Sequence, residues 1–95
     1  MTAYVIVDID VQDKDAYTEY MKLSPISIAA YGGRFLARGG RTERLEGEWT
    51  PKRLVILEFE TVERARQWED SPEYAPAKAI RHRTASSNMV VTEGT

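Results

Sequence analysis

Two acidic residues, Asp8 and Glu58, have the type and placement best suited to acid–base chemistry. Each falls in a stretch with strand-like alternation, and we expect both on one sheet face, near the ends of neighbouring parallel strands. Two carboxylates close together in an apolar cavity raise the pKa of one, which can then act as a general acid or base. The alternative is a pair of interface carboxylates neutralised by arginine. A register error of one residue would move either carboxylate to the other face.

Arg38 precedes Gly39 and Gly40, and this combination can bind a small anion. The guanidinium offers two parallel donors, and glycines leave backbone amides open to a ligand. Adjacent glycines are also common in turns, and no phosphate-loop or dinucleotide motif surrounds them. Two aromatic residues with polar tips, Tyr20 and Trp68, are candidates for lining a small-molecule pocket between helix and sheet, although core packing is their plainer role.

The chain has one histidine and no cysteine. These counts exclude a disulfide scaffold, a thiolate metal site, a cysteine nucleophile and a metal site of several imidazoles, and we expect neither metal nor cofactor. His82 titrates near neutral pH, but helical spacing separates it from the expected core stripe of Tyr74, Ala77 and Ile80. We therefore expect His82 to be solvated, which makes a haem protein the least favoured interpretation. No nucleophile-elbow sequence supports a triad of His82 with Ser86.

Length and composition limit the class of protein to which these residues can belong. Ninety-five residues form a single domain, 1–95, without linker or repeat. The apolar fraction of 42%, the charged fraction of 29% and the net charge of −2 are ordinary for a globular chain and give no basic footprint for nucleic acid. No apolar run approaches the ~20 residues of a membrane span. The first residues indicate a strand rather than a signal peptide, so we expect a cytoplasmic protein.

The elements that position the candidate residues alternate between strand and helix patterns. Asp13 and Thr61 are suited to cap helices, and Pro25 is expected to kink or divide the first one. The predicted strands are 3–11, 34–38, 53–60 and 88–93, and the predicted helices are 14–31, 62–70 and 72–85. With right-handed crossovers, this order predicts an α+β ferredoxin-like βαββαβ sandwich. Its first and third strands are expected to be parallel at the centre, with the helices on one face.

The same alternation predicts an apolar surface on the sheet face that no helix covers. The expected members of this face are Tyr4, Ile6, Leu36, Leu54 and Ile56, with Arg34 and Arg38 beside them. A solvated face alternates to polar residues, so a contiguous apolar patch indicates an interface. We predict a homodimer in which two sheets pack face to face through this surface. The alternative is that the segment 41–51 folds over the face.

Several motifs resemble those of a known family. In order they are Tyr4-Val-Ile-Val-Asp-Ile-Asp, Tyr31-Gly-Gly-Arg-Phe-Leu-Ala-Arg-Gly-Gly, Leu45-Glu-Gly, Arg53-Leu-Val-Ile-Leu-Glu-Phe, Asp70-Ser-Pro-Glu-Tyr and Glu93-Gly94. Each is weak alone, but the ordered set covers essentially the whole chain and is similar to domain of unknown function 1330. The resemblance implies a dimeric α+β barrel, from a superfamily that includes cofactor-free monooxygenases, lactone isomerases, dehalogenating enzymes and chlorite-type haem proteins. The family has no established activity, so the resemblance implies architecture rather than chemistry.

Two functional hypotheses follow. The first is a cofactor-free small-molecule enzyme that performs proton transfer or a rearrangement, with Asp8 or Glu58 as acid or base and Arg38 binding an anionic substrate. The second is a non-catalytic module that binds a small ligand or another protein. A closed pocket that contains Asp8 or Glu58 would favour the enzyme, whereas two carboxylates fully paired in a dry interface would contradict it.

Overall fold

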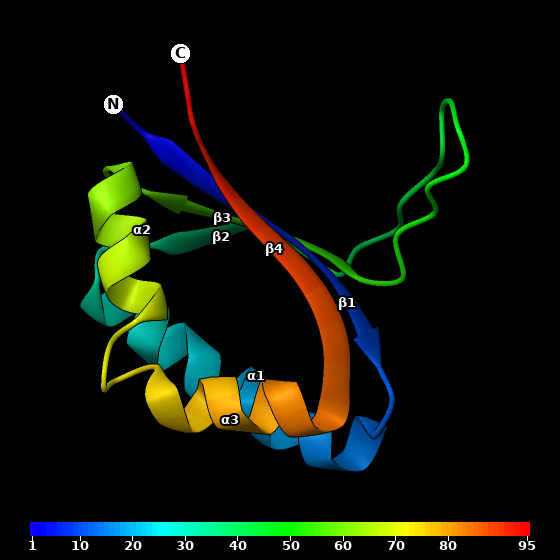
Figure 1. Cartoon of the computed structure of the whole chain (residues 1–95), viewed down its shortest axis with the longest axis horizontal. Helices are drawn as coiled ribbons and strands as arrows, with labels where there is room; N and C mark the ends of the chain where they lie inside the picture. Colours follow the sequence, from blue (N-terminus) through cyan, green and yellow to red (C-terminus); the bar gives the residue numbers. More distant parts are fainter.

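The computed structural model describes residues 1–95 as a four-stranded sheet with three helices on one face (Figure 1). The strands are β1 (Ala3–Val11), β2 (Arg34–Arg38), β3 (Leu54–Phe59) and β4 (Ala85–Glu93), and the helices are α1 (Lys14–Ala30), α2 (Val62–Glu69) and α3 (Ala75–Thr84). Across the sheet the order is β2-β3-β1-β4. The predicted ferredoxin-like α+β sandwich is confirmed, although β4 begins at Ala85 rather than at Asn88. No helix combines the length and the apolar character needed to cross a membrane.

Every pair of neighbouring strands is antiparallel. The prediction that β1 and β3 run parallel is therefore wrong. Each helical crossover joins two strands that run in the same direction. Strand β1 is therefore parallel to β2, and β3 is parallel to β4. In this sheet order each crossover spans an intervening strand, which runs the opposite way. The C-terminal end of β1 consequently lies beside the N-terminal end of β3, where Asp8 is opposite Leu54.

Strand alternation builds the core between the sheet and the helices. The buried strand residues are Val5, Val7 and Ile9 of β1 and Val55, Leu57 and Phe59 of β3. On the helix side, the Trp68 ring lies 4.3 Å from that of Tyr74 and 5.4 Å from that of Phe59, measured between centroids. The Trp68 indole nitrogen donates a hydrogen bond of 3.1 Å to the Ser27 hydroxyl. Trp68 therefore connects α1, α2 and the sheet.

The sheet carries a β-bulge in β2, between Phe35 and Ala37. A bulge adds one residue to one strand and changes the phase of its alternation. Arg34 pairs with Glu58 on the open face, as expected, but Arg38 pairs with Val55, whose side chain is in the core. The prediction that Arg38 shares the open face with Arg34 is therefore wrong.

Arg38 instead completes α1. This helix runs without a break from Lys14 to Ala30, so Pro25 does not divide it. A proline has no amide hydrogen, which leaves the carbonyl four residues earlier, that of Met21, without its helical donor. An Arg38 terminal nitrogen donates to this carbonyl at 2.7 Å. The guanidinium also lies over the Phe35 ring, 4.4 Å from its centroid.

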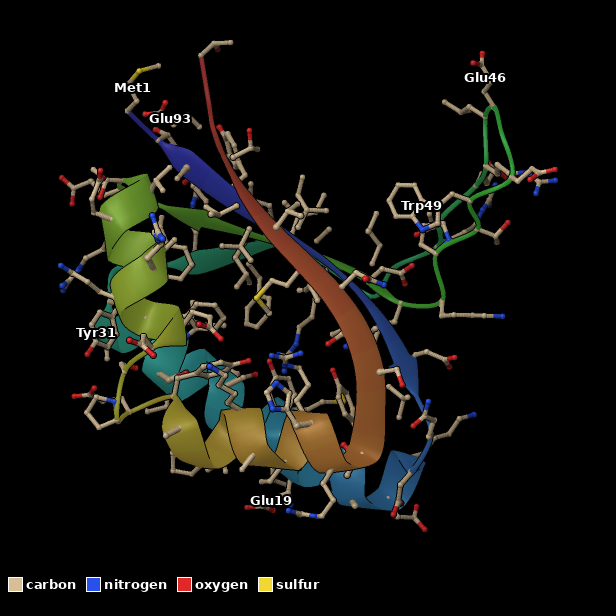
Figure 2. All side chains as sticks on the ribbon, in the orientation of Figure 1. Met1, Glu19, Tyr31, Glu46, Trp49 and Glu93 are labelled. Carbon is tan, nitrogen blue, oxygen red and sulfur yellow. The ribbon has the colours of Figure 1, made fainter.

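The segment 41–51 between β2 and β3, which we call the arm, projects from the side of the sheet opposite the helices (Figure 1). Leu45 is 96% exposed and Trp49 is 62% exposed. Glu46 lies at the far end of the arm, and Trp49 lies near its base (Figure 2). The arm does not fold over the open face, so this alternative to an interface is wrong.

Candidate functional site

A cleft of about 640 Å³ lies between α2, α3 and β4. The two helices meet at a steep angle across the loop that joins them, and β4 begins at the far end of α3 and runs across from this corner (Figure 1). The apolar side of the cleft includes Val5, Trp68, Ala85, Met89 and Val91. Its polar side includes Arg66, Glu69, Asp70, Arg81, His82 and Ser87. Seven of the thirteen lining residues are apolar, and a site that combines an apolar wall with polar groups can hold a small molecule.

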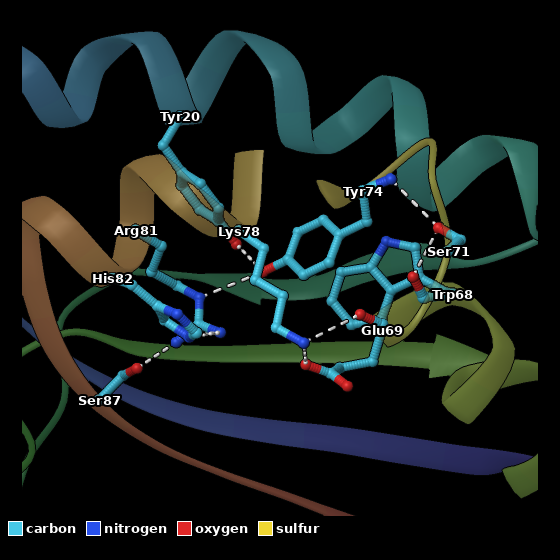
Figure 3. Close-up of polar contacts among 9 residues, drawn as sticks. All are labelled: Tyr20, Trp68, Glu69, Ser71, Tyr74, Lys78, Arg81, His82 and Ser87. Carbon is cyan, nitrogen blue, oxygen red and sulfur yellow. Dashed lines mark hydrogen bonds and ion pairs between the residues drawn. The ribbon is translucent and has the colours of Figure 1, made fainter. Parts of the chain in front are cut away.

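Arg81 is the buried cation of this cleft, with 4% of its surface exposed. Its Nε donates to the Tyr74 hydroxyl at 3.1 Å, and its Nη1 donates to the Ser87 hydroxyl (Figure 3). Its Nη2 lies 3.4 Å from Nε2 of His82. None of the ion pairs in the structure includes Arg81. Buried charges are ordinarily paired, so a buried guanidinium held by neutral partners presents its charge to the cleft.

The hydrogen-bonding capacity of Arg81 is not exhausted by these partners. A guanidinium carries five N–H groups, and three of them meet Tyr74, Ser87 and His82. Each terminal nitrogen therefore keeps one further N–H. Two such groups match the two oxygens of a carboxylate, which guanidinium groups bind with planar geometry.

Two tyrosines, Tyr20 and Tyr74, form a hydrogen-bonded chain that ends at Arg81. The hydroxyl oxygens of Tyr20 and Tyr74 lie 2.9 Å apart, and the Tyr74 hydroxyl accepts from Arg81. Burial raises the pKa of Tyr20 far above its ordinary value, so this phenol stays neutral and supplies no counter-charge. Of the two predicted pocket aromatics, Trp68 lines the cleft, while Tyr20 reaches it through Tyr74. Their contribution to ligand binding stays a prediction.

His82 is exposed, as predicted, and it also borders the cleft, which the sequence analysis did not anticipate. Arg81 has no acceptor atom, so Nε2 of His82 must be the acceptor in the contact between them. The contact therefore requires an Nε2 atom that carries no proton. A basic nitrogen therefore lies directly beside the guanidinium.

The acidic side chains of the cleft do not neutralise this cationic end. Glu69 forms an ion pair of 2.6 Å with Nζ of Lys78 (Figure 3). Asp70 is exposed at the end of α2, across the cleft from β4. Arg66 also lines the cleft, so its polar side holds two arginines and two carboxylates, and Arg81 is the buried cation among them.

Asp8 and Glu58 lie on the open face, but they are not neighbours. The antiparallel register places Glu58 opposite Tyr4 and Asp8 opposite Leu54. The two pairs are four positions apart along the strands, a distance of about 13 Å at ~3.3 Å per residue. The prediction of an adjacent carboxylate pair is wrong, because it assumed parallel strands. Any catalytic role of either residue stays a prediction.

Each of these carboxylates has its own partners. Glu58 accepts from Nε of Arg34 at 2.7 Å. Asp8 accepts from the Trp49 indole at 3.0 Å and from the Lys52 amide at 2.9 Å. The hydrogen bond from Trp49 is the main reason why the pKa of Asp8 is lowered. Asp8 therefore attaches the base of the arm to β1.

This attachment predicts an acid-sensitive contact. A carboxyl whose pKa is lowered by folding contributes stability above its ordinary pKa and loses it as the pH falls through the lowered value. The Trp49 indole N–H resonance is therefore expected to shift on acidification, when Asp8 takes up a proton. The measurement is an NMR titration of both indole protons. Asp8→Asn should abolish the shift, and Trp68, bonded to Ser27, should not shift with Asp8. A Trp49 titration that persists in Asp8→Asn would contradict the contact.

A family model described as domain of unknown function (DUF1330) matches residues 2–95. This chain belongs to that family. This match confirms the family resemblance that the ordered motifs indicated. Among curated proteins there is no match.

Solved structures share the fold of this DUF1330 chain at low sequence identity. A protein of unknown function from Rhodopseudomonas palustris is 17% identical, with a TM-score of 0.79 over 99% of this chain and 82% of that one. A dimeric ferredoxin-like protein of unknown function from Jannaschia sp. is 13% identical, with a TM-score of 0.73 over 99% and 100%. SnoaB, a cofactor-independent oxygenase from Streptomyces nogalater, is 10% identical, with a TM-score of 0.68 over 99% and 93%.

Sequence reasoning missed Arg81, although a signal for it is present. Tyr74, Ala77 and Arg81 follow the spacing i, i+3, i+7, which places them on one helix face. The sequence analysis assigned Ile80 to this stripe, whereas Arg81 is the more buried of the two residues in the DUF1330 chain. An arginine in a core stripe, near a strand serine that can bind it, is the pattern that would have indicated the site.

Proposed function

We propose that this DUF1330 protein is a cofactor-independent small-molecule enzyme whose substrate is an organic anion bound against Arg81. The observation that carries the proposal is the buried guanidinium, which lines a cleft and has no carboxylate partner. The anion site predicted at Arg38 is thereby replaced, because that guanidinium is bound to the Met21 carbonyl. The fold is shared with a cofactor-independent oxygenase, which supports an enzyme.

The cleft also defines the class of substrate. Val5, Met89 and Val91 provide an apolar wall for a hydrocarbon or aromatic body. The buried guanidinium of Arg81 matches one anionic group, and the exposed Arg66 lines the cleft together with Glu69 and Asp70. The proposal is therefore an amphipathic organic anion, such as an aryl-substituted carboxylate.

The binding prediction uses phenylacetate, with 2-phenylethanol as its uncharged analogue. Phenylacetate is expected to bind, and Arg81→Gln is expected to weaken it at least tenfold, because charged hydrogen bonds contribute about 1.5–3 kcal/mol each. Titration calorimetry measures both affinities. Arg83→Gln is the matched control, because Arg83 is an exposed arginine on the same helix. Arg81→Lys retains the charge and serves if Arg81→Gln does not fold. Equal affinity for phenylacetate and 2-phenylethanol would contradict the proposal.

The alternative function is a non-catalytic ligand-binding module. It shares the cleft and the role of Arg81, so binding alone does not separate the two. An enzyme converts or exchanges atoms of a bound substrate, whereas a binding module returns the ligand unchanged. The presence of a neutral imidazole beside the guanidinium favours the enzyme.

We also propose that the protein is a homodimer through the open sheet face. Tyr4, Ile6, Leu54 and Ile56 form an apolar surface there, and Val90 on β4 is 59% exposed beside Ile6. The arm extends on the same side, with exposed Leu45 and Trp49 available to a second copy. Similar structures described as dimeric ferredoxin-like proteins support this arrangement.

A further inference from the structure

We propose that His82 is the catalytic base of this cleft, and that it removes a carbon-bound proton next to the carbonyl group of an α-keto acid. This inference rests on the proposed function, because it requires an anion at Arg81. It adds a reaction class, proton transfer at carbon, and a substrate class, the enolisable keto acids. It also replaces the predicted carboxylate base by an imidazole.

The geometry supports this role through the contact between the two side chains. Nε2 of His82 is 3.4 Å from Nη2 of Arg81, and it is the acceptor in this contact. An oxygen bound to the free N–H on Nη2 therefore lies near the unprotonated imidazole nitrogen. The carbon next to that oxygen's carbonyl is then within reach of the base. His82 is exposed, so its ring has room to turn toward a bound ligand.

The other titratable groups around His82 are less suited to act as the base. Across the cleft on α2, Glu69 is paired with Lys78, and Asp70 is exposed at the helix end. Arg66 of α2 is cationic, and on β4 the nearby polar group is Ser87, which binds Arg81. His82 is the residue in this group that places a nitrogen acceptor beside Arg81.

The proposed step is balanced without a further reactant. The bond between hydrogen and the carbon beside the ketone breaks, and the proton goes to Nε2 of His82. The electron pair of that bond becomes the carbon–carbon double bond of the enolate, and the negative charge moves to the carbonyl oxygen. The free N–H on Nη1 of Arg81 holds a carboxylate oxygen, and the free N–H on Nη2 holds this oxygen. The imidazolium then returns its proton to carbon or to oxygen, which regenerates the neutral imidazole.

Phenylpyruvate is the probe for this step, because it combines a carboxylate, an aromatic body and acidic hydrogens beside the ketone. We expect the protein in D₂O to accelerate exchange of these hydrogens, measured by NMR, above the rate in buffer. His82→Gln should lower the catalysed rate about 100-fold, the usual scale of general-base catalysis. Arg83→Gln should keep the wild-type rate.

Phenyllactate distinguishes failure of the inference from failure of the proposed function. It has the same carboxylate and ring but no ketone, so it should bind with equal affinity to wild type and to His82→Gln. Phenyllactate binding without phenylpyruvate exchange would overturn the role of His82 and leave the anion site intact. Unchanged exchange in His82→Gln would also overturn it. Loss of phenyllactate binding in the wild type would overturn both proposals.

Discussion

Replacement of Trp68 by alanine is expected to lower the free energy of unfolding by about 3–5 kcal/mol, the usual cost of removing a large buried ring. Trp68 is 1% exposed and lies between the rings of Phe59 and Tyr74. A domain has only about 5–15 kcal/mol of stability in total, so this loss removes much of it. Urea denaturation followed by circular dichroism measures the change.

Two further variants identify the cause of this loss. Ile26→Ala truncates an apolar side chain that is 71% exposed on α1 and should change stability by less than about 0.5 kcal/mol. Ser27→Ala leaves the Trp68 ring in place but removes the acceptor of its indole N–H, which should cost about 1–3 kcal/mol. Equal losses in Trp68→Ala and Ile26→Ala would show that the core is not organised around Trp68.

Replacement of Ile56 by glutamate is expected to convert the proposed homodimer into monomers at micromolar concentration. Ile56 is opposite Ile6 in the two central strands, so two copies of the open face would bring it to the middle of the interface. A carboxylate buried there without a partner costs about 3–5 kcal/mol, which weakens association roughly 100- to 1000-fold or more. Sedimentation velocity measures the mass of each variant.

Ile26→Glu is the matched control for this substitution. Ile26 is 71% exposed on α1, on the helix side of the molecule, so its replacement should leave the dimer intact. A dimer that survives Ile56→Glu would place the interface elsewhere. A wild-type protein that sediments as a monomer would contradict the homodimer itself.

Much of the fold could be predicted because burial controls it. Val5, Val7 and Ile9 form an unbroken aliphatic series, whereas the other face of β1 includes Asp8 and Asp10, and this difference indicates which face meets the helices. Asp13 and Thr61 cap α1 and α2 as predicted, because a capping side chain acts on amides three residues away. Alternation and capping depend on residues that are close together in the chain, so both can be recognised in the sequence.

The site was harder to predict because it depends on how separate elements align. Asp8 and Glu58 are on the predicted face, but only strand direction decides how far apart they lie. Arg38 lies on the opposite face from the predicted one because β2 contains a bulge, and the residue types of β2 do not indicate this bulge. Arg81 was overlooked because charged residues are rarely buried, and the hydroxyls that hold it come from Tyr74 and from β4.

The pairing of β1 with β4 along its whole length has a consequence for the speed of folding. The first strand remains without one of its two neighbours until every other helix and strand has been synthesised and β4 has docked. Contacts between such distant segments require the closure of a long loop, which slows folding relative to local contacts. One wall of the Arg81 cleft is β4 itself. The Arg81 cleft is therefore complete only after β4 has docked, and until then the edge of β1 is open to non-native strand pairing.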